Sequence, residues 1–135
     1  NIAIVAFTTD GDVFGGFYSV AVSDQNVDVM DPNLFVFSFE SHGRCMTPQR
    51  FLLKETSQEF ASVQLFSGDR DGWFVCFDGH SSFCYFMLGN EKSFTGTFNL
   101  SEAFVGLENT TLTGKEGEKP DSLHHCTRII AVQLM

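Results

Sequence analysis

Short runs of apolar residues, separated by polar turn residues, predict β-strands at the start of the chain. Residues 2–7 are apolar on both alternating faces, which is typical of a strand covered on both sides. Thr9-Asp10-Gly11-Asp12 follows with turn chemistry, because aspartate bonds the backbone ahead of it and glycine tolerates a positive φ. Residues 15–22 resume an extended pattern, so we expect the first two strands to form a hairpin.

The clearest strand pattern is Leu34-Phe35-Val36-Phe37-Ser38-Phe39, which places three phenylalanines on one face. We expect turns at Ser67-Gly68-Asp69 and at Asp78-Gly79-His80. Only residues 56–61 and 101–107 have helical character. Further extended runs are predicted at residues 50–53, 62–66, 73–77, 83–88 and 127–134.

Many short strands with little helix predict an α+β fold, mainly an antiparallel β-sandwich of two sheets with minor short helices. The 135 residues suit a single domain that spans the whole chain. We expect the core between the sheets to include Phe35, Phe37, Phe39, Phe74, Val75, Ile130 and Val132.

The charge of the chain disfavours nucleic acid as a partner. Asp and Glu total 17 against 8 Lys and Arg, a net charge of -9, which repels a phosphate backbone. No apolar stretch reaches the length of a transmembrane helix, so we expect no membrane insertion. The sequence is therefore interpreted as a soluble protein of the cytoplasm, with the nucleus as a second compartment.

The cysteines and histidines lack the spacing of a metal site. Cys45, Cys76, Cys84 and Cys126 include no CxxC pair, and we expect four reduced thiols rather than a disulfide framework. Neither a phosphate-binding glycine motif nor a GxSxG nucleophile elbow occurs. We therefore expect no metal, no cofactor and no catalytic residue.

Two other functions stay open on the residues alone. His125 beside Cys126 suits a cysteine- or histidine-dependent hydrolase, although neighbours in an extended segment point to opposite faces. The second open function is that of a stress-responsive DNA-binding regulator, although the negative net charge of the chain disfavours binding to DNA.

Cys45 is the candidate redox thiol. Arg44 precedes it, and a neighbouring cation stabilises a thiolate. The surrounding serine, glycine and proline predict an exposed loop that admits an oxidant. A loop cysteine of ordinary acidity is the alternative interpretation.

Two motifs in order resemble the TLDc domain of oxidation-resistance proteins. That family reads D-G-x-V-F-G-G after a strand, then a loop and a D-x-x-x-F-x-F-S strand. Gln49-Arg50-Phe51, Phe66-Ser67-Gly68 before Trp73-Phe74-Val75, and residues 93–99 follow in compatible order, so the resemblance touches most of the chain. The matching residues of the two motifs are Asp10, Gly11, Val13, Phe14, Gly15, Gly16, Asp31, Phe35, Phe37 and Ser38.

The chain also departs from this family, as a divergent member or a fragment does. We expect a helical segment that usually precedes the first motif to be missing. Ile130-Ala131-Val132-Gln133 stands where the family commonly has an L-E-V-W-like strand, so the acidic and tryptophan positions are absent.

The resemblance implies a β-sandwich, a role in oxidative-stress resistance and binding to a subunit of the vacuolar ATPase. It implies no enzymatic mechanism, so the chain is interpreted as a non-catalytic protein-interaction module. Its motif residues are expected to specify the fold rather than to contact a substrate. Glycines 15 and 16, for example, would let a strand bend or pack against another backbone.

Overall fold

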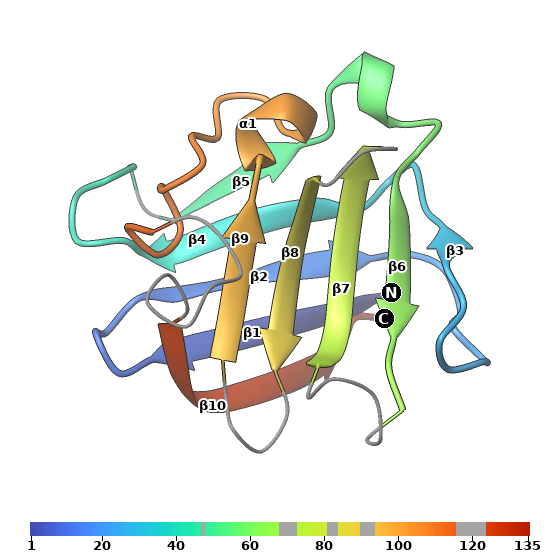
Figure 1. The fold of residues 1–135 in the computed structure, drawn as a ribbon, viewed down its shortest axis with the longest axis horizontal. Coiled ribbons are helices and arrows are strands. Elements are labelled where there is room, and N and C mark those ends of the chain that lie inside the picture. Colours follow the sequence, from blue (N-terminus) through green and yellow to red (C-terminus); the bar gives the residue numbers. More distant parts are fainter. Residues whose placement is uncertain (47, 68–72, 81–83, 90–93, 116–123) are drawn as a thin grey trace.

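The computed structural model describes residues 1–46, 48–67, 73–80, 84–89, 94–115 and 124–135 (Figure 1). Within these ranges no helix is long and apolar enough to cross a membrane. The elements in chain order are β1 (Ile2–Thr8), β2 (Val13–Tyr18), β3 (Val29–Met30), β4 (Phe35–Glu40), β5 (Gln49–Leu52), the 3₁₀ helix η1 (Glu55–Ser57), β6 (Ser62–Leu65), β7 (Trp73–His80), β8 (Cys84–Gly89), β9 (Phe94–Phe98), α1 (Leu100–Ala103) and β10 (His124–Gln133).

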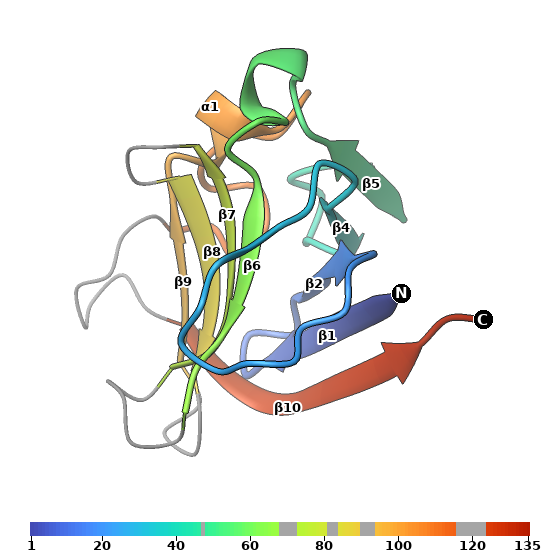
Figure 2. The same ribbon diagram turned by 90° about the vertical axis from the view of Figure 1, so that its right-hand side faces the viewer.

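The strands form two packed layers, as Figure 2 shows. They pair antiparallel in the order β3-β6-β7-β8-β9-β10-β1-β2-β4-β5. We call β10, β1, β2, β4 and β5 the first sheet, and β3, β6, β7, β8 and β9 the second sheet. Strand β10 also pairs with β9 through His124 and His125, so it joins the two layers along one edge. The predicted fold class, a mainly antiparallel sandwich with short helices, is confirmed.

Helix α1 and the segment after it close the opposite edge of the sandwich. The backbone N–H of Lys54 donates to the carbonyl of Ala103 at 2.7 Å, and that of Val105 donates to the carbonyl of Leu52 at 2.8 Å. The Lys54 ammonium also donates to the carbonyl of Ser101 at 2.6 Å. Strand β5 is therefore tied to the helix that follows the second sheet.

Large apolar side chains from both sheets fill the space between them. Phe14 comes from β2 and Phe77 from β7, and both are fully buried. A Cβ atom built on Gly16 would lie 2.6–2.7 Å from three atoms of the Phe77 ring. Only glycine allows the second sheet to approach β2 this closely. Other large, fully buried side chains are Ile4, Leu34, Val36, Phe51, Val63, Leu100, Phe104 and Leu112.

Several elements differ from the sequence predictions. The strand expected over residues 15–22 ends at Tyr18, and the helical segments expected at 56–61 and 101–107 are the shorter η1 and α1. Strand β3 has only two residues, too few for an alternating pattern, and β9 contains Gly96, which weakens the strand signal. The turn predicted at Asp78-Gly79-His80 is wrong, because these residues continue β7 with a shift in register. Gly79 is needed there because a Cβ would lie 2.5 Å from that of Ala103. Most of the predicted turn at residues 67–69 lies outside the described residues.

We predict that Gly16→Ala destabilises the fold by about 1–3 kcal/mol, because the added methyl group overlaps the Phe77 ring. The measurement is the free energy of unfolding in urea. The matched control is the double variant with Phe77→Leu, which should lose less stability than the sum of the two single variants. Strict additivity would show that this contact does not limit the distance between the sheets.

Candidate functional site: an apolar hollow on the first sheet

The outer face of the first sheet, which turns away from the second sheet, is almost entirely apolar. Strand alternation sends Phe35, Phe37 and Phe39 to this face, while Val36 and Ser38 point inward and are buried. The register aligns two rows of outward residues across five strands, Val132-Ala3-Phe17-Phe35-Leu52 and Ile130-Val5-Gly15-Phe37-Arg50.

The outer face holds a hollow of about 470 Å³, which we call the phenylalanine hollow. Gly15 has no side chain, and a Cβ there would lie 2.6 Å from Cζ of Phe37. The Phe37 ring therefore packs over the strand at Gly15 and is only 7% exposed. The residues that line the hollow are Ala3, Val5, Phe17, Phe35, Phe37, Phe39, Pro48, Gln49, Arg50, Val132 and Leu134.

Four phenylalanine rings form one wall of the hollow in a continuous series. The rings of Phe17 and Phe35 stack with their centroids 4.7 Å apart. Phe35 meets Phe37 edge to face at 6.4 Å, and Phe37 lies 5.0 Å from Phe39. Such aromatic pairs contribute about 0.5–1.5 kcal/mol each beyond their burial, so the wall is held in place before any ligand binds.

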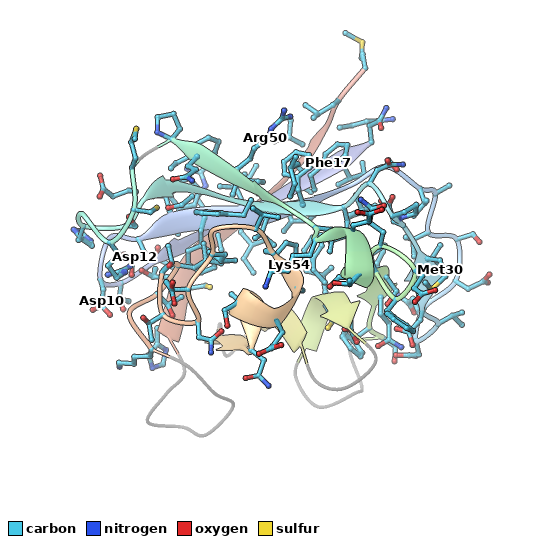
Figure 3. The ribbon with its side chains drawn as sticks, turned by 90° about the horizontal axis from the view of Figure 1, so that it is seen from above. Asp10, Asp12, Phe17, Met30, Arg50 and Lys54 are labelled. Carbon is cyan, nitrogen blue, oxygen red and sulfur yellow. The ribbon has the colours of Figure 1, made fainter. Side chains whose placement is uncertain are left out.

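Two arginines lie on the same outer face. The guanidinium of Arg50 on β5 lies over the Phe35 ring at 5.9 Å, and that of Arg128 on β10 lies over Phe7 at the same distance. Figure 3 shows Arg50 and Phe17 on the side of the sheet that faces away from the second sheet. The face thus combines an apolar centre with a cation on each of its two outermost strands.

This surface corrects part of the predicted core. Phe39 is 51% exposed and Val132 is also exposed, whereas both were expected inside. Phe35 and Ile130 are only partly buried. The common face of the three β4 phenylalanines was predicted, but not that this face is the outer one. Val75 is buried between the sheets as expected, whereas Phe37 is buried on the outer face, and the side chain of Phe74 lies outside those that the structure describes.

A buried ion pair holds the loops at one end of the sandwich, where Figure 3 shows Asp10 and Asp12. Asp12 is 1% exposed and pairs with the guanidinium of Arg44. Arg44 also donates to the carbonyls of Thr111 at 2.9 Å and Leu112 at 3.0 Å. Three loops distant in sequence are thereby joined, and the buried carboxylate is compensated.

His42 adds a second link between these loops. Its Nε2 lies 2.8 Å from the carbonyl of Asp10 and 3.7 Å from the carboxylate of Asp12. The backbone N–H groups of His42 and Ser41 donate to Glu40, which lowers the pKa of that carboxyl below its usual value. The contacts of Asp10 and Asp12 are therefore with the neighbouring loop.

Asp31 of the second motif holds the end of β2. Its buried carboxylate accepts hydrogen bonds from the backbone N–H of Ser19 at 2.5 Å, the Ser19 hydroxyl at 2.8 Å and the backbone N–H of Asn33 at 3.0 Å. These three bonds satisfy the buried charge within the protein. The position of Asp31 is consistent with a fold-specifying residue.

The remaining motif residues lie in the turn, in the core or on the outer face. Gly11 has φ +88°, a conformation that favours glycine, and Val13 is half-buried on β2. Phe14 is fully buried, and the buried Ser38 hydroxyl has no hydrogen-bond partner among the described residues. Phe35 and Phe37 line the phenylalanine hollow.

Cys45 is half-buried beside Ser41, with its Sγ 3.3 Å from the serine Oγ. The neighbouring cation on which the redox prediction depends is engaged elsewhere, because the Arg44 guanidinium binds Asp12 and two carbonyls. The redox role of Cys45 stays a prediction with weaker electrostatic support.

In the part of the chain that the structure describes, no three His, Cys, Asp or Glu side chains gather closely enough to hold a metal ion. His125 is exposed while Cys126 is buried, and burial raises the pKa of the Cys126 thiol to about 11. An activated cysteine needs the opposite shift.

Comparisons with family models, curated proteins and solved structures found no match to this chain.

We predict opposite outcomes for two neighbouring phenylalanines of β4. Phe37→Ala should lower the free energy of unfolding by about 3–5 kcal/mol, because the ring is buried. Phe39→Ala should cost about 1 kcal/mol or less, because half of that side chain is already exposed. Urea denaturation followed by tryptophan fluorescence measures both. Equal losses would mean that Phe39 is covered in solution.

The thiols should differ in their reaction with iodoacetamide at pH 8. Cys45 is half-buried and should be alkylated first, whereas Cys126 is 5% exposed with a pKa of about 11. About one Cys126 thiol in a thousand is then ionised, so it should stay unmodified in the folded protein. Peptide-resolved mass spectrometry gives the order, with complete labelling in urea as the control. Rapid alkylation of Cys126 would restore the cysteine-hydrolase alternative.

Proposed function

We propose that the chain is a non-catalytic protein-interaction module that binds its partner in the phenylalanine hollow. The observation that carries the proposal is the open apolar face of the first sheet, where Phe39, Leu52, Val132 and Leu134 are each at least two-fifths exposed. Side chains of this kind are normally covered, and exposed apolar patches with a polar rim are typical of binding sites. The partner supplies that cover.

The resemblance to TLDc domains supports a specific partner. Both phenylalanines of the D-x-x-x-F-x-F-S motif, Phe35 and Phe37, line the hollow. We propose a subunit of the vacuolar ATPase as the partner and protection against oxidative stress as the biological role. The location in the cytoplasm, where that subunit would be accessible, belongs to the same proposal.

The two alternatives have less support. A cysteine hydrolase would need a thiol of lowered pKa, whereas burial raises that of Cys126. A DNA-binding regulator would need a cationic surface, and the chain carries a net charge of -9.

Site-specific photo-crosslinking tests this function. Benzoylphenylalanine replaces Phe39 at the hollow or, as a matched control, Phe60, which is 39% exposed on the segment before β6. After irradiation in lysate, mass spectrometry should find subunits of the vacuolar ATPase crosslinked from position 39 and not from position 60.

Two results would contradict the proposal. Identical crosslinked proteins from both positions would show that the hollow has no selective partner. A selective partner unrelated to the vacuolar ATPase would keep the interaction module and reject the partner that the resemblance implies.

A further inference from the structure

The net charge on the outer face of the first sheet is opposite in sign to that of the chain as a whole. In the described part of this sheet, the register places Arg50 on β5 and Arg128 on β10 outward, together with Glu40, which stands opposite Val13. The Glu40 carboxylate already accepts the backbone N–H groups of Ser41 and His42, so the two guanidinium groups exceed it in charge. The whole chain has 17 acidic and only 8 basic residues. A partner with carboxylates beside its apolar side chains would therefore complement this face.

The backbone of the sheet excludes one mode of binding. Over the hollow, β1, β2 and β4 each pair with a strand on both sides. Their N–H and C=O groups are used within the sheet, so an added strand would find no hydrogen-bond partners there. A ligand that lies over these three strands therefore binds through its side chains, as an amphipathic helix does.

The dimensions of the face fit a short helix. Arg50 and Arg128 lie on strands separated by four interstrand gaps, a distance of about 19 Å at about 4.8 Å per gap. A helix rises about 1.5 Å per residue, so about 13 residues span the two arginines. Apolar residues at the i, i+3, i+4 and i+7 spacing would enter the hollow between them.

A second copy of this chain is a poorer occupant. A two-fold dimer through this face would bring two surfaces of the same charge together, each with the same two arginines, in molecules that each carry a charge of -9. The described helices, α1 with four residues and η1 with three, are also too short to fill the partner's hollow.

We propose that the phenylalanine hollow binds an amphipathic helix of about 13 residues whose apolar stripe is flanked at both ends by acidic residues. This inference rests on the proposed function and specifies the chemistry of the partner segment. The apolar stripe contacts Phe39, Val132 and Leu134, and the carboxylates pair with Arg50 and Arg128.

Two synthetic peptides of 16 residues test the charge requirement. Both have leucines at the helical spacing, one with glutamates at each end and the other with lysines. Fluorescence anisotropy of the labelled peptides with the full chain should give a Kd at least about fivefold lower for the glutamate peptide. The glutamates form two exposed ion pairs with the arginines, whereas the lysines of the other peptide are repelled by the same arginines. Raising the salt concentration should narrow the difference.

Charge reversal in the protein completes the test. Arg50→Glu and Arg128→Glu should each weaken binding of the glutamate peptide and strengthen binding of the lysine peptide. Lys115→Glu is the matched control, because it changes the net charge equally at a position outside this sheet and should leave the two Kd values in the same order. Phe39→Ser should weaken the binding of both peptides.

Three results would overturn the inference. Equal Kd values for the two peptides would remove the charge requirement. If neither peptide binds while crosslinking from position 39 succeeds, the docking surface is kept and the helical ligand is rejected. Dimerisation in sedimentation experiments that Phe39→Ser abolishes would assign the face to a second copy of the chain.

Discussion

The absence of side chains at two consecutive residues of β2 determines the geometry on both sides of the first sheet. Gly16 faces inward and admits the Phe77 ring to the backbone, which sets how closely the two layers approach. Gly15 faces outward and lets Phe37 pack over the strand instead of standing away from it. A larger residue at position 16 would push the sheets apart. One at position 15 would overlap the Ile4 carbonyl oxygen as well as the Phe37 ring, and would therefore disturb the pairing of β1 with β2. The core and the candidate site thus depend on the same dipeptide.

The exposed face has a thermodynamic cost that the rest of the fold must offset. Each large apolar side chain left in water forgoes roughly 1.5–3 kcal/mol of the stabilisation that burial provides. Elsewhere two buried carboxylates are satisfied internally, since Asp31 accepts three hydrogen bonds and Asp12 pairs with Arg44. An exposed apolar surface beside such well-satisfied polar groups is consistent with a surface kept for binding.

The sequence predicted the local features well and the long-range ones poorly. Alternation located β1, β4, β5, β6 and β8 to within a residue or two, and it grouped Phe35, Phe37 and Phe39 on one face. Alternation could not tell which face of β4 points inward. An apolar face usually lies in the core, and only the arrangement of the two sheets shows that the phenylalanine face of β4 points outward. The hollow brings Ala3 and Val132 beside the phenylalanines, and the Asp12–Arg44 pair joins residues 32 positions apart. No local spacing signals such contacts.

Strand β10 also has a consequence for the order in which the chain can fold during synthesis. It lies between β1 and β9, so both of those strands keep an unpaired edge until residues 124–133 leave the ribosome. Unpaired edges of apolar strands are templates for aggregation. Nascent chains of this protein would therefore benefit from a chaperone that covers β1 until β10 is available.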